Sequence, residues 1–193
     1  MDEAVAAQLT TDLVAGTTAS AARLFLDNGG RPPVILWRPQ PSDLELPQLS
    51  FLLRYWEGLP RPSGASGPHL KLIDPLEMRE ALGFVTLIDI VDGGNDFLYR
   101  VYGTRIAERY GADLTGKRTS QTDNGSYAAA FLVAIYRAVL RRAEPVFSEH
   151  YPSPRSSTAK WSRIVLPLVG DGGRIERFLA GIIAGPWRPS SSG

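Results

Sequence analysis

The sequence predicts an α+β fold in which one antiparallel sheet of five strands carries helices on one face and follows an N-terminal helical extension. Three observations support this class. The apolar pattern changes from a helical to an alternating period near residue 84, the best amphipathic helix spans about 126–142, and three strand-like segments follow that helix. Two strands, then helices, then three strands are typical of a sheet with segregated helices.

The first 41 residues differ from the rest and are predicted to be an extension with a proline-rich linker. They are rich in Ala and Thr, and Gly29-Gly30 can end the second of two weak helices. Val34 to Trp37 is a short apolar run that fits either a strand or a packed arm. We expect the extension to be partly mobile or to pack on a neighbouring molecule. The helices are expected at about 3–15 and 19–27, and the linker at 32–41.

Residues 42–68 are predicted to be a flanking helix and a loop. Pro47 suits the first position of a helix, where its missing N–H costs nothing. The helix 47–58 carries one apolar stripe and, on an adjacent face, a second stripe of Phe51 and Tyr55. One sheet face cannot cover so wide an arc, so we expect this helix to form a homodimer. The first stripe consists of Leu49, Leu52, Leu53 and Trp56.

Residues 69–186 are predicted to form the main domain, and 187–193 a disordered tail. Asp74 is expected to cap a short helix that begins at Pro75. The long helix has apolar residues at helical spacing and arginines near its C-terminus, where cations suit the helix dipole. The strands are expected at 84–91, 96–102, 145–151, 159–169 and 174–184, with a short helix at about 105–110.

Composition excludes several classes of function. Lys plus Arg is 21 and Asp plus Glu is 20, giving a net charge of +1, so a one-sided basic surface for nucleic acid or for an anionic membrane is not expected. The chain has no cysteine, which excludes disulfides, thiolate metal sites, a cysteine nucleophile and flavin photochemistry through a cysteine adduct. No leader-like start or long apolar run occurs, so we expect a cytoplasmic protein without membrane contact.

The candidate chemical groups are few. His69 and His150 are the two histidines, and neither has a His or acidic neighbour at ligand spacing, so we expect no metal and no haem. No phosphate-binding loop or nucleophile elbow is present. Arg100 lies in the predicted strand 96–102, shortly before a glycine turn, and points to the face opposite Phe97, Tyr99 and Val101. We expect it to make a structural fork to a carboxylate, with Asp74 or Asp113 as partners, and the alternative is direct contact with a ligand.

Several short motifs, in this order, resemble a PAS domain, in particular the compact PAS proteins common in alphaproteobacteria. The resemblance covers roughly residues 48–185, whereas the loop 60–68 departs from the tighter loop of the family. It implies a sensor or protein-interaction module and no reaction. The matching motifs are Tyr55-Trp56, Asp74-Pro75, Tyr99-Arg100, Gly103-Thr104, the run RYGADLTGK at 109–117, Pro167-Leu168 and Asp171-Gly172.

The function that follows is a sensory or regulatory module, not an enzyme, that binds a small ligand or a signalling protein. The chain has no kinase, helix-turn-helix or cyclase motif, so it is expected to act through a partner, including a second copy of itself. The alternative is a small enzyme on a cone-shaped α+β fold with an acid–base pair in its pocket. The cofactor is unknown. Candidate ligand-binding residues are Tyr99, Arg100, Tyr102, Ile106, Tyr110, Phe131, Ile135, Tyr136, His150 and Trp161.

Overall fold

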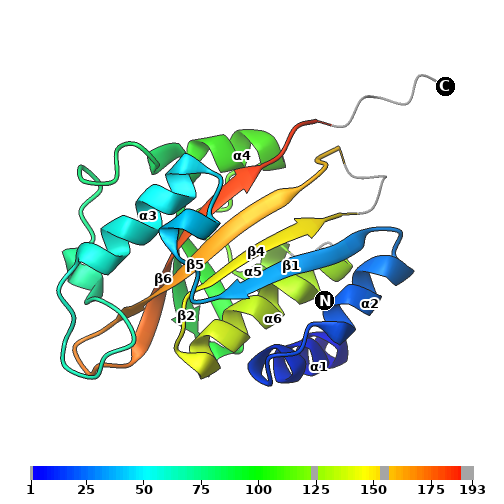
Figure 1. Ribbon diagram of the computed structural model, residues 1–193, viewed down its shortest axis with the longest axis horizontal. Coiled ribbons are helices and arrows are strands. Elements are labelled where there is room, and N and C mark those ends of the chain that lie inside the picture. Colours follow the sequence, from blue (N-terminus) through cyan, green and yellow to red (C-terminus); the bar gives the residue numbers. More distant parts are fainter. Residues whose placement is uncertain (1, 123–125, 153–156, 188–193) are drawn as a thin grey trace.

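The protein, seen here as a computed structural model that describes residues 2–122, 126–152 and 157–187, has the α+β fold that the sequence predicts. The expected tail at 187–193 lies outside these residues, apart from Trp187. One antiparallel sheet of six strands has the order β1-β4-β5-β6-β2-β3 (Figure 1). The strands are β1 (Arg31–Trp37), β2 (Val85–Val91), β3 (Asp96–Tyr102), β4 (Val146–Tyr151), β5 (Trp161–Val169) and β6 (Ile175–Ala184).

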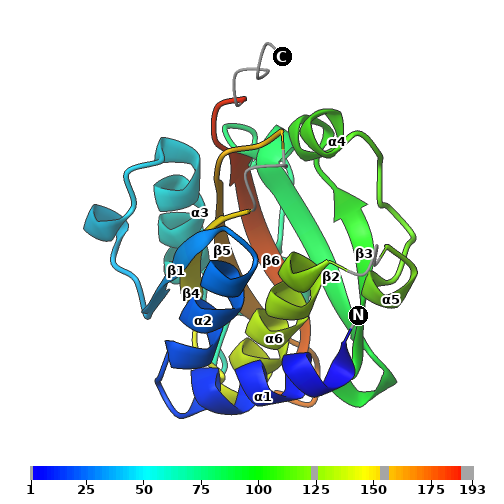
Figure 2. The ribbon, with the colours of Figure 1, turned by 90° about the vertical axis from the view of Figure 1, so that its right-hand side faces the viewer.

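Helices cover both faces of this sheet, which corrects the expectation that they cover one (Figure 2). The inner face packs against α6 and the outer face against α3, so two separate apolar cores form. The helices are α1 (Glu3–Val14), α2 (Ala19–Asp27), α3 (Pro47–Gly58), α4 (Thr104–Tyr110), α5 (Thr119–Thr122) and α6 (Tyr127–Arg142). Single 3-10 turns occur at Pro41–Asp43, Leu70–Leu72, Leu82–Phe84 and Asp92–Gly94.

The sixth strand is β1, which replaces most of the expected linker and confirms the strand alternative for Val34 to Trp37. It pairs antiparallel with β4, from Val34 opposite Glu149 to Trp37 opposite Val146. Its register shifts between Arg31 and Val34, around the two prolines that suggested a linker. An edge strand tolerates proline because one side of its backbone makes no ladder hydrogen bonds. Proline content alone therefore misjudged this segment, and the five-strand expectation was one strand short.

The N-terminal helices share the inner core. Leu9 and Leu13 of α1 and Phe25 of α2 are almost fully buried. Arg137 of α6 donates to both carboxylate oxygens of Glu3, at 2.5 and 3.2 Å. These contacts join α1 and α2 to the domain within the chain, whereas a mobile arm or an arm on a neighbour was expected. A domain boundary at residue 41 stays a prediction.

Helix α6 crosses the inner face and supplies most of its core. Its first turn is capped by Ser126, whose hydroxyl accepts a hydrogen bond from the Ala129 N–H at 3.2 Å. Phe131 and Ile135 are fully buried and Leu132 is half-buried, as their spacing predicts. The expected helix after Asp74 is absent: Asp74 accepts from the Leu76 N–H at 2.8 Å, but the residues that follow form turns. Pro75 and its neighbours lack the long apolar stripe that anchors α6.

Helix α3 lies on the outer face, and its first apolar stripe is buried there. The indole N–H of Trp56 donates to the carbonyl of Pro167 at 2.8 Å. Gly181 of β6 permits the close approach, since a Cβ at this position would lie 2.6 Å from a methyl group of Leu52. The sheet therefore covers the stripe that suggested an interface, while Phe51 and Tyr55 are half-buried. A homodimer through this helix stays a prediction.

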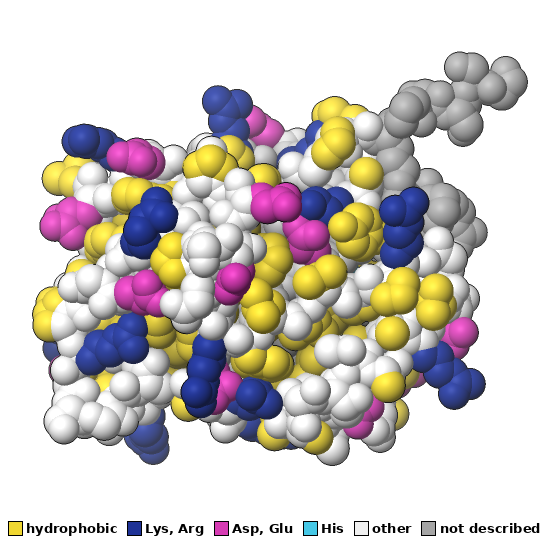
Figure 3. All heavy atoms as spheres, in the orientation of Figure 1, with side chains coloured by type: hydrophobic (Ala, Val, Ile, Leu, Met, Phe, Trp, Pro, Cys, Tyr) yellow, Lys and Arg dark blue, Asp and Glu magenta, His cyan; other side chains and the backbone are white. Residues whose placement is uncertain are grey.

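The surface on the α3 side mixes charge of both signs with apolar side chains (Figure 3). Basic side chains do not gather on this face, in line with the balanced composition. No helix in the described part of the chain is long and apolar enough to cross a membrane.

Candidate functional site: a cavity on the inner face

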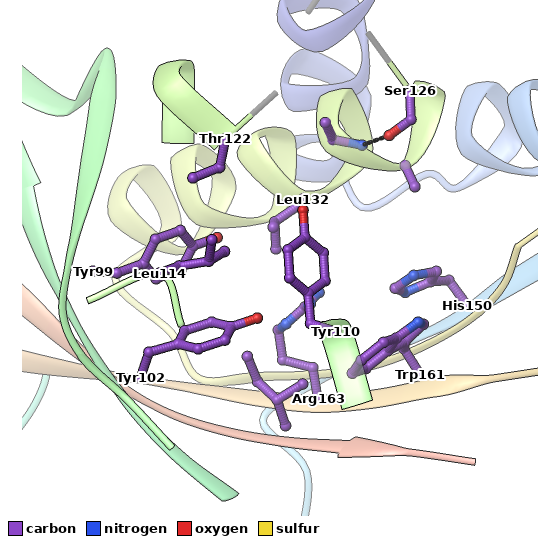
Figure 4. A pocket seen from close by; sticks show the side chains of 13 residues that line it. Tyr99, Tyr102, Tyr110, Leu114, Thr122, Ser126, Leu132, His150, Trp161 and Arg163 are labelled. Atoms are coloured by element: carbon purple, nitrogen blue, oxygen red, sulfur yellow. Dashed lines mark hydrogen bonds between the residues drawn. The ribbon is translucent and has the colours of Figure 1, made fainter. Parts of the chain in front are cut away.

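The inner face contains a cavity of about 160 Å³ between the sheet and the helices α4 to α6 (Figure 4). Alternation along β4, β5 and β6 directs side chains of these strands into it, and on β3 the register shift at Arg100 lets both Tyr99 and Tyr102 face it. A packed core leaves voids little larger than water, so a space of this size is distinctive. The described residues that line it are Tyr99, Tyr102, Tyr110, Leu114, Thr122, Ser126, Ala128, Ala129, Leu132, His150, Trp161, Arg163 and Ile182.

Three tyrosines form one wall of the cavity. The ring centroids of Tyr99 and Tyr102 on β3 are 5.3 Å apart, and that of Tyr110 on α4 is 6.4 Å from Tyr102. The Tyr102 hydroxyl points toward the middle of the space (Figure 4). Burial raises the pKa of Tyr99 and of Tyr102 well above the usual value, so both phenols are neutral at physiological pH. The wall thus offers aromatic surface and neutral hydroxyl groups.

Arg163 brings a positive charge into this apolar space. It lies on β5 between Trp161 and Val165, which share its face, and only 6% of its surface is exposed. Its Nε and Nη1 atoms are buried and have no hydrogen-bond partner among the described residues. Among the described residues that line the cavity, none is Asp or Glu. A buried guanidinium without a partner is costly, because it has lost water and gained no acceptor.

His150 lies beside Trp161 at the other side of the cavity (Figure 4). Its ring is 5.8 Å from the rings of both Phe25 and Phe131, and no described residue forms a hydrogen bond with its Nδ1 atom. Burial, together with the Arg163 charge, lowers the pKa of His150 to about 3. The imidazole is therefore neutral at physiological pH. The described residues contain no cluster of three His, Cys, Asp or Glu side chains that could hold a metal ion.

The structure brings together half of the residues expected to bind a ligand. Tyr99, Tyr102, Tyr110, His150 and Trp161 line the cavity. The others lie elsewhere, for reasons of packing. Tyr136, Phe131, Ile135 and Ile106 are buried in the apolar core without lining the cavity, and Arg100 is on the outer side of the sheet.

Arg100 makes the structural fork that its position suggested, but with a different partner. Its Nε and Nη2 atoms donate to one carboxylate oxygen of Asp89, at 2.8 and 2.6 Å, and Arg177 donates to the other oxygen. Neither Asp74 nor Asp113 is the acceptor. Asp89 lies on β2, next to β3, and the strand alternates Ile88 and Ile90 into the inner core, so the ion pairs are on the opposite side.

Sequence reasoning missed Arg163, the polar centre of the cavity. One signal was available: Arg163 is a charged residue at an alternating position of an otherwise apolar strand, in step with Trp161 and Val165. The lining residues of α6 and its neighbours could be found only from the packing. The other missed residues are Leu114, Thr122, Ser126, Ala128, Ala129, Leu132 and Ile182.

A second hollow of about 360 Å³ adjoins the cavity and shares some of its lining residues, among them Tyr110, His150 and Trp161. Arg109 of α4 borders it, but this guanidinium is already engaged. It donates to the Gly185 carbonyl at 2.6 Å and stacks 3.4 Å over the ring of Trp187. The second hollow therefore gives the cavity additional space without a free cation among its described residues.

The comparisons with known proteins gave one match. A family model described as a PAS domain matches residues 45–184, which include the strands β2 to β6 and all described residues that line the cavity. Neither the comparison with curated proteins nor that with solved structures gave a match.

Proposed function

Because the chain belongs to the PAS-domain family, we propose that it is a sensory or regulatory module whose inner cavity binds a small molecule. The observation that supports this most directly is the cavity itself. It lies beside the inner core, aromatic side chains form much of its wall, and buried polar atoms of Arg163 and His150 have no partner among the described residues. A mostly apolar space with a few convergent polar groups is the usual form of a small-molecule site.

A ligand in this cavity would contact several elements at once. The lining side chains come from α4, α5, α6 and from four strands, so an occupant would add contacts among all of them. A ligand that binds only one arrangement of these elements stabilises that arrangement and increases its population. We propose that the change is passed to a protein partner, including a second copy of this chain, in the cytoplasm.

The alternative of a small enzyme receives less support from the same site. Acid–base chemistry needs a group that gains and loses a proton near neutral pH. His150, with its pKa lowered to about 3, is neutral there, and no described lining residue is a carboxylic acid. Tyr99, Tyr102 and His150 are therefore all neutral near pH 7, which suits binding better than proton transfer.

Ligand binding can be tested by filling the cavity. In Leu132→Trp the larger side chain would occupy the space, whereas Leu140→Trp, on the same helix and also half-buried, would not reach a cavity-lining position. We expect compounds from a metabolite panel that raise the melting temperature of the wild type and of Leu140→Trp to have no effect on Leu132→Trp. A panel without effect on the wild type, together with no bound compound in a native mass spectrum, would overturn the proposal.

A further inference from the structure

The charge of Arg163 has no counterpart among the residues that the structure describes. From β3 it faces the neutral phenols of Tyr99 and Tyr102, from α4 Tyr110, from β4 Ser148 and His150, and from β6 Ile182. Tyr136 of α6 is also close enough for Arg163 to affect its pKa, and burial keeps that phenol neutral. No ion pair with Arg163 occurs in the described part of the chain, and the cavity therefore carries one uncompensated positive charge.

A second buried arginine shows how a guanidinium with only a structural role is paired in this protein. Arg137 of α6 is 7% exposed, nearly the same as Arg163. It donates to Glu3 and to the carbonyl of Asn95 at 2.7 Å. Arg163 differs from it in lacking any acceptor within the described part of the chain, while one side of its surroundings is an open cavity. We infer that the missing acceptor belongs to the ligand, and that the ligand is a small organic monocarboxylate.

The polar atoms around Arg163 fit a carboxylate. A guanidinium offers a planar fork of N–H donors, which matches two carboxylate oxygens. Ser148 lies directly opposite Arg163 in the register of β4 and β5, and its buried hydroxyl has no partner among the described residues. The Nδ1 atom of His150, two residues further along β4, is also unpaired. A carboxylate at this point would give acceptors to donors that otherwise have none.

The size and the walls of the cavity define the rest of the ligand. An engineered cavity of about 150 Å³ in another protein holds one benzene molecule, so 160 Å³ admits a body of one ring. Tyr99, Tyr102 and Trp161 provide surfaces on which a ring can pack. One positive charge in apolar surroundings favours a ligand with one negative charge over a phosphate dianion. Benzoate has these properties and is a suitable probe.

This inference rests on the proposed function, and the two can be tested separately. Binding of benzoate, benzamide and benzylamine to the full chain would be measured by calorimetry at neutral pH. The three probes share the ring and differ in charge. We expect benzoate to bind and the neutral and cationic probes to bind about 30-fold more weakly or not at all, since a buried charge pair that lacks one member loses at least this much.

Two variants test the role of Arg163 directly. Arg163→Met removes the charge and keeps a long side chain, and we expect its affinity for benzoate to fall by about 30-fold or more. Arg163→Lys keeps the charge without the planar fork and should lie between Arg163→Met and the wild type. Arg100→Met is the control: it removes the same charge from the outer side of the sheet, and we expect benzoate to bind it as it binds the wild type.

The outcomes distinguish the proposed ion pair from ligand binding in general. Equal binding of benzoate and benzamide to the wild type, or undiminished benzoate binding by Arg163→Met, would overturn the proposed ion pair between Arg163 and the ligand. The proposal that the cavity binds a small molecule would still stand. If none of the probes binds the wild type, the proposal of a monocarboxylate ligand is wrong. The metabolite panel with Leu132→Trp then tests whether the cavity binds any small molecule. The comparison of benzoate with benzamide needs no variant, so it stands even if Arg163→Met does not fold.

Discussion

Without ligand, the variant Arg163→Met should be more stable than the wild type. The aliphatic stem of Arg163 is already buried, so the substitution mainly removes a guanidinium whose Nε and Nη1 atoms have no acceptor. A buried polar group that lacks a partner costs about 1–3 kcal/mol. Water that enters the cavity recovers part of this, and we therefore expect a gain in the free energy of unfolding of about 1 kcal/mol, or about 2–4 °C in melting temperature.

Urea unfolding at neutral pH, followed by circular dichroism, measures this gain, with protein refolded beforehand so that bound compounds are lost. The matched control is Arg137→Met, which removes an arginine of similar burial that does have acceptors, Glu3 and Asn95. Because Glu3 is 63% exposed, we expect this control to lose only about 1–2 kcal/mol. A loss of stability in Arg163→Met comparable to that of Arg137→Met would refute the argument that Arg163 is unpaired.

Three further predictions concern the core, the pH dependence and association. Ile135→Ala should cost about 2–5 kcal/mol in urea unfolding, and unchanged stability would mean that this face of α6 is misplaced. The pKa of His150 is lowered to about 3 in the folded state. Its contribution to the free energy of unfolding is therefore fully present above the pKa of His150 in the unfolded chain, and it declines as pH falls toward 3. Relative to His150→Phe, the wild type should lose about 2 kcal/mol between pH 7 and pH 5, and parallel pH profiles of the two proteins would contradict it. Light scattering of the full-length chain should give the mass of a dimer, while a monomer at high concentration would rule out association through α3.

Local patterns were enough to predict most of the elements but not their partners. The strands β2 to β6 and the helix α6 lie within one or two residues of their predicted ranges, because each has a clear apolar period and a glycine turn or cap at its end. Strand β1 was uncertain because its prolines obscure the pattern, and pairing with β4 decides its conformation. Helices cover both faces of the sheet because of the paths that the chain takes between the strands, and the periodicity of the sequence does not encode these paths.

The site was harder to predict than the fold. Alternation predicted that either Tyr99 or Tyr102 faces a ligand, together with Trp161 or Ser162, whereas both tyrosines and Trp161 line the cavity. Both tyrosines can do so because the register of β2 and β3 shifts and leaves Arg100 as an extra residue between them. The partner of Arg100 could not be found in this way, because the register of β2 and β3 shifts between Leu87 and Ile88. Of the two buried arginines that the structure describes, Arg163 faces an open space and Arg137 does not. This difference depends on how α4 and α6 pack together, which no single segment of the sequence specifies.

The edge strand β1 has a practical consequence for work on this protein. The family match begins at residue 45, so a fragment cut to that boundary would lack β1, α1 and α2. Such a fragment would leave the backbone edge of β4 unpaired, which invites strand-to-strand aggregation. It would also lose Phe25, whose ring packs against His150 beside the cavity. Failure of that fragment to stay monomeric, or to bind anything, would therefore reflect a missing part of the fold and not the behaviour of the intact chain.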